Sequence, residues 1–275
     1  MLAHSVVTSP SVDPEHYMLF LHGILGTRAN WRGIARRFVE AKPEWGAILV
    51  DLRGHGDSLE VTAPHTLRTA ATDVAELERS LGTPVRGALG HSFGGKVALE
   101  WLRKREGQQT EVWTIDSSPS PSGADRDSTA TAEVIRTLEA LPREWPSRDA
   151  FVAGLVEAGQ APPIAQWLAM NLRRTVTGAR TFGPDLGVIR DLVEDYARTD
   201  SWDIVEALPE ACTLDMVIGG RSEVFSALDR ARAEQLAARN SEISVHLVER
   251  AGHWIHVDAA DALVALLTSP RSPQR

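Results

Sequence analysis

Short apolar runs recur along the chain, and amphipathic stretches separate several of them. Helical patterns fall at residues 31–39, 67–80 and 94–103. Alternating strands and helices indicate an α/β fold, with a mostly parallel central sheet and helices on both faces. In such a sheet, chemistry gathers at the carboxyl ends of the strands. Buried strands are predicted at residues 17–21, 47–50, 85–89, 112–115, 214–218 and 243–248.

The alternation stops after Ile115, because residues 117–210 contain no convincing strand pattern. We therefore expect a core made of residues 1–116 and 209–275, with a helical insertion at 117–208. An insertion this long is usually functional in a compact domain, so we expect it to act as a lid. The tail at 269–275 is expected to be disordered. Helices are predicted in the insertion at 127–141, 148–157, 162–172 and 185–196.

Composition narrows the class of protein. The 275 residues are 43% hydrophobic and 24% charged, the balance of a soluble globular protein. A net charge of −8 disfavours nucleic-acid binding. The single cysteine, Cys212, can form neither an intrachain disulfide nor a cysteine-based metal site. No apolar run is long enough to insert into a membrane, and the first residues lack a signal-peptide pattern, so we expect a cytoplasmic protein. We expect it to be a monomer or a homodimer.

One serine lies between glycines in the stretch Gly90-His-Ser-Phe-Gly94, after a predicted strand and before a predicted helix. Small residues on both sides permit the tight turn that exposes a nucleophilic hydroxyl. A serine that only caps the helix would fit the same five residues. The position between strand and helix favours Ser92 as a nucleophile.

A serine nucleophile needs a histidine as base, and two of the nine histidines follow the last predicted strand. His253 comes directly after Gly252, on the loop where its ring can reach the edge of the sheet. His256 lies one turn later and is interpreted as structural. We therefore predict that His253 is the base, and that activity rises with pH as its imidazole becomes neutral.

The acid that orients this histidine has two candidate positions. Asp116 ends the strand at 112–115, and Glu223 lies in the loop after the strand at 214–218. Ser222 fills the place in that loop where many proteins of this fold carry an aspartate. We favour Asp116, whose alternative role is to cap the segment that follows it.

The oxyanion of a tetrahedral intermediate needs backbone N–H donors. Phe93, the residue after the serine, can supply one donor, and Ile24 in the loop His22-Gly-Ile-Leu-Gly26 can supply the other. The pocket is expected to be apolar, although such side chains are often core residues. The candidate substrate-binding residues are Leu25, Trp167, Met170, Phe225 and Trp254.

Four stretches resemble the α/β-hydrolase superfamily over nearly the whole chain: HGILG at 22–26, DLRGHGDS at 51–58, GHSFGGK at 90–96 and GHWIH at 252–256. The chain is most similar to the small serine esterases and acyl-thioesterases of bacteria. That resemblance implies a helical lid, an acid at Asp116, and a pocket-lining segment at 166–172. The lid is rich in charge and alanine and resembles the family only loosely. Arg53, His55 and Asp57 are interpreted as structural.

These features predict a serine hydrolase that cleaves carboxylic esters of short to medium acyl chains, with no metal or organic cofactor. Acyl-thioesters are the nearest alternative substrates, and a C–C bond hydrolase of the same fold comes next. Dehalogenases and epoxide hydrolases are disfavoured, because they need a carboxylate where Ser92 stands. Two alternatives have no catalytic activity: a hydrolase-like protein that only binds a ligand, and a protein that binds partners through its acidic lid.

Overall fold

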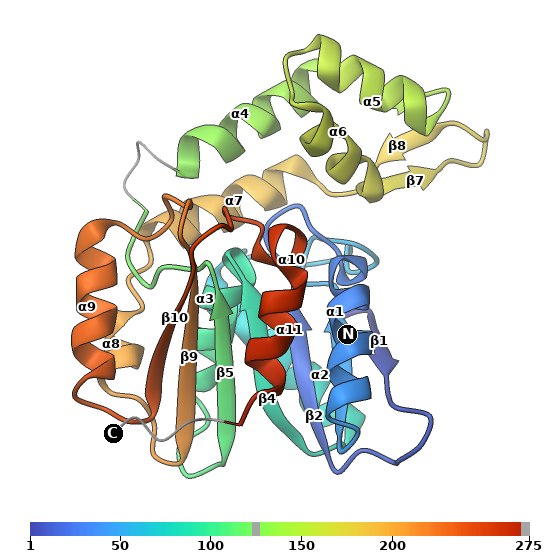
Figure 1. Cartoon of the computed structure of the whole chain (residues 1–275). Coiled ribbons are helices and arrows are strands. Elements are labelled where there is room, and N and C mark those ends of the chain that lie inside the picture. The colour runs from blue at the N-terminus through green and yellow to red at the C-terminus, as the bar shows by residue number, and fades with distance from the viewer. Residues whose placement is uncertain (123–126, 271–275) are drawn as a thin grey trace.

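A computed structural model of the chain describes residues 1–122 and 127–270, apart from the side chains of residues 127–130. The expected tail at 269–275 therefore lies mostly outside the described residues. Seven strands form a twisted sheet in the order β1-β3-β2-β4-β5-β9-β10 (Figure 1). The strands are β1 (His4–Val7), β2 (His16–Leu21), β3 (Trp45–Val50), β4 (Val85–His91), β5 (Thr110–Ile115), β9 (Cys212–Gly219) and β10 (Ile243–Val248).

The predicted α/β-hydrolase fold class is confirmed, since β2 to β10 of this sheet pair in parallel. β1 was not predicted, and it pairs antiparallel with β3 at the edge of the sheet. It is four residues long and only partly buried, so its sequence carries little of the apolar signal of an inner strand.

Side chains of successive strand residues enter different apolar layers, because they point to opposite faces of the sheet. Leu19 and Leu21 pack in one layer, while Met18 and Phe20 pack in the other. Helices α2 (Leu67–Leu81), α3 (Phe93–Leu102), α8 (Trp202–Glu206) and α9 (Ala227–Ala237) cover the first face. The second face is covered by η1 (Arg28–Trp31), α1 (Arg32–Ala41), α10 (Ile255–Asp258) and α11 (Ala260–Thr268).

Most of the chain inserted between β5 and β9 lies above the carboxyl ends of the strands, whereas α8 lies beside the sheet (Figure 1). Much of this inserted segment has an apolar cluster of its own, which includes Phe151, Leu155 and Leu168. Before α8, its elements are α4 (Asp127–Ala140), β6 (Glu144–Trp145), α5 (Arg148–Glu157), α6 (Pro162–Leu168), η2 (Ala169–Asn171), β7 (Leu172–Arg174), β8 (Arg180–Phe182) and α7 (Leu186–Arg198).

The inserted segment contains a small sheet in the order β6-β8-β7, although its sequence predicted helices alone. These strands have two or three residues each, too few to show alternation of apolar and polar positions. The last part of the segment joins the core: Leu192, Tyr196 and Trp202 belong to the apolar layer of α2 and α3.

Both ends of the inserted segment meet the buried side chain of Lys96 on α3. Its Nζ donates to the carbonyls of Ser120, Tyr196 and Thr199 at 2.7, 3.0 and 2.8 Å. The Nζ also lies 4.4 Å from the centre of the Tyr196 ring. The helix that begins beside Ser92 thus holds the entry and the exit of the segment.

Substituting Lys96 by Met should destabilise the fold, because several buried carbonyls would lose a charged donor. We expect the free energy of unfolding to fall by about 2 to 4 kcal/mol, measured by urea denaturation. The matched control is Lys104→Met, because Lys104 is exposed just after the same helix; its change should stay within about 0.5 kcal/mol. Equal stability of the two variants would contradict this role of Lys96.

Candidate active site

Ser92 stands at the junction of β4 and α3, with φ 50° and ψ −117°. A positive φ is strained for a serine, and such strain needs support from the surrounding structure. A Cβ on Gly90 would overlap the backbone of Gly94, so the turn can close only with glycine there. The Ser92 carbonyl accepts hydrogen bonds from the Gly95 N–H at 2.9 Å and the Ser117 hydroxyl at 2.6 Å.

Asp116 and His253 form a hydrogen-bonded pair near the end of β5. The Nδ1 of His253 lies 2.7 Å from Oδ2 of Asp116, whose side chain is fully buried. Asp116 also has a positive φ of 44°, which turns its backbone where the inserted segment begins. Ser92 and His253 line the same cavity. The structure therefore brings the predicted serine, histidine and aspartate together.

Two further donors hold the Asp116 carboxylate. The backbone N–H of Gly219 donates to Oδ1 at 3.0 Å, and the Ser222 hydroxyl donates to Oδ2, the oxygen that contacts His253. Ser222, noted in the sequence only as a missing aspartate, thus supports the acid from the neighbouring loop. Glu223 is exposed, so the carboxylate bonded to His253 is that of Asp116.

His91 supports His253 from the position just before the nucleophile. Its Nε2–H donates to the His253 carbonyl at 2.9 Å, and the two rings lie 4.6 Å apart. Burial lowers the pKa of His91 well below its usual value, and the nearby His253 and His256 lower it further. His91 is therefore neutral and acts as a donor at the back of the site. Sequence reasoning did not assign this role to His91, and the one available signal was its position next to Ser92 in the stretch at 90–94.

The loop after β2 carries the expected oxyanion donor Ile24. The carbonyl of Gly23 accepts from the Gly26 N–H at 3.0 Å and from His22 Nδ1–H at 2.7 Å. In a trans peptide the N–H of Ile24 points opposite to that carbonyl, so these bonds fix its direction. Ile24 and Phe93 both line the cavity. The Phe93 N–H begins α3, where backbone N–H groups have no partner within the helix.

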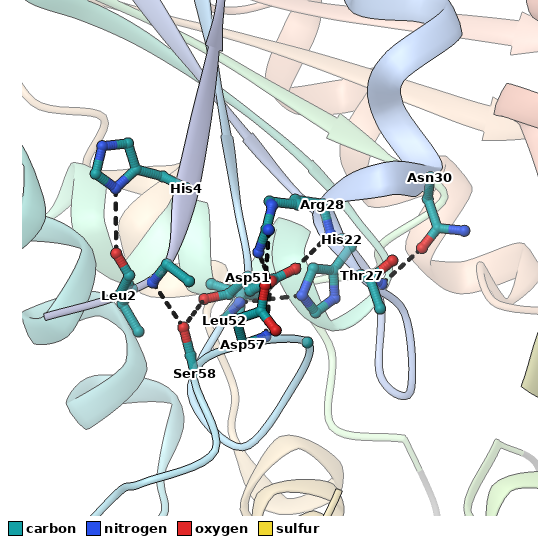
Figure 2. A network of polar contacts seen from close by, with 12 residues as sticks. Leu2, His4, His22, Thr27, Arg28, Asn30, Asp51, Leu52, Asp57 and Ser58 are labelled. Atoms are coloured by element: carbon teal, nitrogen blue, oxygen red, sulfur yellow. Dashed lines mark hydrogen bonds and ion pairs between the residues drawn. The ribbon is translucent and has the colours of Figure 1, made fainter. Parts of the chain in front are cut away.

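The loop at 51–58 is hydrogen-bonded to the loop at 22–26, which carries Ile24 and is called the oxyanion loop below. His22 Nε2 accepts from the Leu52 N–H at 3.0 Å, while His55 Nε2 accepts from the Leu25 N–H at 2.9 Å. Figure 2 shows Asp51 beside the contact between His22 and Leu52. Asp51 pairs with Arg28 and accepts the Asp57 N–H at 2.8 Å.

Arg53 and Asp57, which were interpreted from the sequence as structural, both form ion pairs. Arg53 pairs with Asp73 at 2.7 Å, and Asp57 pairs with Arg28 and Arg173 at 2.7 and 2.6 Å. These ion pairs attach the loop both to the core and to the inserted segment.

A cavity of about 700 Å³ lies between the core and the inserted segment. Its described lining includes Leu25, Trp167 and Trp254, three of the five residues expected to bind substrate. The rings of Trp167 and Trp254 lie 5.7 Å apart and form a wall that joins the inserted segment to the His253 loop. Val134, Pro163, Ile164, Val193, Tyr196 and Val257, which the sequence did not single out, also line the cavity.

The other two expected substrate-binding residues are not part of this lining. Met170 is 44% exposed and points toward Asn30, with its Sδ 3.9 Å from the Asn30 amide nitrogen. Phe225 is buried just before α9 and is not among the lining residues of the cavity. Both corrections have one cause: the sequence marks large apolar side chains but does not show which way they point. His256, interpreted as structural, lines the cavity, and burial lowers its pKa to about 4.

Within the described residues, no cluster of three or more histidine, cysteine or acidic side chains has the geometry to hold a metal ion. The same residues include no helix with the length and apolarity needed to cross a bilayer.

The buried histidines make stability depend on pH. Burial lowers the pKa of His22 to about 4; burial and then the nearby His22 lower that of His55 to about 3. In the unfolded chain both groups titrate near 6.5, so between pH 6.5 and about 4 the unfolded state binds more protons. Stability should therefore fall as the pH drops through this window.

The variant His55→Gln removes one of these groups but keeps an acceptor for the Leu25 N–H. Its free energy of unfolding should change less steeply between pH 6.5 and 4, by about 1.4 kcal/mol per pH unit. Urea denaturation at several pH values measures both slopes. Parallel slopes for wild type and variant would show that His55 does not titrate in this way.

Comparisons with known proteins agree with this architecture. The model of the alpha/beta hydrolase family matches residues 18–266. A 2-succinyl-6-hydroxy-2,4-cyclohexadiene-1-carboxylate synthase of Serratia proteamaculans is 35% identical over 267 residues, covering 97% of each chain. An sn-1-specific diacylglycerol lipase of Danio rerio is 25% identical over 248 residues, covering 88% of this chain and 74% of the lipase.

Solved structures show the same fold. A marine microorganism esterase has a TM-score of 0.80 at 18% identity, covering 96% of this chain and 97% of the esterase. The family match spans most of the chain and includes every residue of the site described above. The chain therefore belongs to the alpha/beta hydrolase family and is an enzyme of the hydrolase kind.

Proposed function

We propose that the protein is a serine hydrolase that cleaves carboxylic esters of short to medium acyl chains. One observation supports this most directly: Ser92, on its strained turn, faces the same largely apolar cavity as His253, which is bonded to the buried Asp116. A serine that lines a cavity, an oriented imidazole and a buried carboxylate are the parts that acyl transfer to a serine needs.

In the proposed mechanism, Nε2 of His253 takes the proton from Ser92 as the hydroxyl oxygen attacks the ester carbonyl carbon. Asp116 holds Nδ1–H, which fixes the tautomer and stabilises the imidazolium. The imidazolium then gives its proton to the departing alcohol, leaving an acyl group on Ser92. A water that loses its proton to His253 attacks the acyl carbon. His253 then returns this proton to the Ser92 oxygen as the bond between that oxygen and the acyl carbon breaks, which releases the carboxylic acid.

The backbone N–H groups of Ile24 and Phe93 would stabilise the oxyanion in both tetrahedral intermediates. The start of α3 adds the positive end of the helix dipole at the same point. One donor of this kind contributes about 3 kcal/mol to lowering the barrier.

The cavity lining supports an uncharged, apolar acyl group. Among the described lining residues there is no lysine or arginine, and the one carboxylate is Asp258. A substrate with several carboxylates, as the name of the Serratia relative implies, would meet no cation on these walls. The lining therefore favours simple esters over a multiply charged substrate, and acyl-thioesters remain the nearest alternative because they use the same chemistry.

The inserted segment would act as a lid, because Pro163, Ile164 and Trp167 form part of the cavity wall. Residues 117–208 would thus decide which acyl chains fit, while the core supplies the reacting groups. A ligand-binding protein without catalysis would have no need of the bonds that orient His253 and Asp116.

Replacing the reacting groups tests the mechanism. Ser92→Ala and Asp116→Asn should each lower kcat for p-nitrophenyl esters by about 10³-fold or more, because nucleophile and tautomer control are lost. Glu223→Gln is the matched control and should remain near wild type, since Glu223 is exposed. A large loss in Glu223→Gln, or full activity in Asp116→Asn, would overturn the assignment of the acid.

Charge and chain length test the substrate class. Across p-nitrophenyl esters from acetate to palmitate, kcat/KM should peak at a short or medium chain that fits the cavity of about 700 Å³. A p-nitrophenyl ester with a terminal carboxylate should be cleaved about tenfold or more slowly than its uncharged counterpart. Preference for the charged ester, or no cleavage of any ester, would contradict the proposed substrate.

A further inference from the structure

Leu25, next to the proposed oxyanion donor Ile24, is held at an unusual backbone position. Its φ is 57°, a left-handed conformation that costs about 1 kcal/mol or more for a residue with a Cβ. Such a conformation persists only where the surroundings impose it. Three contacts do so, and they reach the residue from different parts of the molecule.

The core supplies one contact and the inserted segment supplies two. The core residue His55 accepts the Leu25 N–H at 2.9 Å. The Leu25 side chain, 1% exposed, belongs to the apolar cluster of the inserted segment, with Phe151 and Leu168. The Leu25 carbonyl accepts a hydrogen bond from Nδ2 of Asn171 at 2.7 Å.

Asn171 is well placed to act as a fixed donor. Asn171 is the last residue of η2 and is 5% exposed. Its backbone carbonyl accepts the Gly183 N–H at 3.0 Å. The backbone of Asn171 is therefore held within the inserted segment, while its side-chain amide bonds to the loop that carries Ile24.

The Leu25 carbonyl that accepts from Asn171 lies two peptide units beyond the proposed oxyanion donor, the Ile24 N–H. Rotation at Leu25 would move the Ile24 N–H, because the turn from Gly23 to Gly26 is a single hydrogen-bonded unit. A displacement of about 1 Å in a catalytic group can cost about 10²-fold in rate.

We propose that Asn171 is a positioning residue for the oxyanion hole, so that stabilisation of the transition state depends on the inserted segment being docked on the core. This rests on the proposed serine-hydrolase function. The segment then does more than shape the pocket: an undocked segment would leave Ser92 and His253 in place but release the loop that carries Ile24.

Arg173 provides the matched control, because it lies two residues along the same segment and also bonds to the core. Its guanidinium contacts the Gly56 carbonyl and Asp57, at 2.6 Å for the carboxylate, and both lie outside the oxyanion loop. Arg173→Gln removes one contact between the segment and the core but leaves the bond from Asn171 to Leu25, so the segment should stay docked. Asn171→Leu and Asn171→Asp both remove the donor to Leu25 with little change in size.

The experiment measures kcat and KM for the best p-nitrophenyl ester, with thermal unfolding as a check on the fold. Both Asn171 variants should lose about 10- to 100-fold in kcat with KM within about threefold, because the bond acts in the transition state. A trifluoromethyl ketone of the same chain, whose adduct carries an oxyanion, should bind more weakly by the factor by which kcat/KM falls. The alcohol obtained by reducing this ketone forms no oxyanion, so the Asn171 variants should bind it as tightly as wild type does. Arg173→Gln should keep its kcat within about twofold of wild type.

Several results would overturn the proposal. Unchanged kcat and ketone affinity in the Asn171 variants would remove the positioning role, and an equal loss in Arg173→Gln would assign the effect to loose docking in general. If wild type cleaves no ester, the rate at which a fluorophosphonate labels Ser92 gives the same comparison, and equal rates in wild type and Asn171→Leu refute the inference alone. If wild type is neither active nor labelled, the proposed function fails and this inference fails with it.

Discussion

The strained turn at Ser92 is the constraint on which the rest of the site depends. A serine at φ 50° keeps this position only because Gly90 and Gly94 allow two backbone segments to touch, and because Ser117 and Gly95 hold the Ser92 carbonyl. The turn sets the start of α3, and so places Phe93 at the first position of the helix, beside Ser92 in the cavity lining.

Around this turn the protein uses neutral histidines as structural connectors. His22 and His55 each accept a backbone N–H through Nε2, and His91 donates to the carbonyl of His253. Burial keeps the pKa of each well below 6.5, which suits groups that need one bare nitrogen and one N–H. His253 is the half-exposed member of the group, open to the cavity where a base is needed.

The fold class could be predicted, and Ser92, His253 and Asp116 could be selected as candidates, because both depend on local pattern and chain order. The apolar runs gave the inner strands, and the serine between glycines lay after the right strand. β1 and the small sheet β6-β8-β7 could not be found, because their strands are short and partly exposed. Met170 and Phe225 were placed in the pocket wrongly, since apolar character does not tell a cavity wall from a core or a surface.

The sequence by itself thus determined the α/β fold and the identities of Ser92, His253 and Asp116 as candidates, because nucleophile, acid and histidine must follow strands that end at one edge. Only the tertiary structure showed that Asp116 is bonded to His253, gave Ser222 its contact, and brought Asn171 to Leu25 across 146 positions of the chain. The physical reason is that hydrogen-bond direction depends on the packing of distant elements, which no local pattern of residues records.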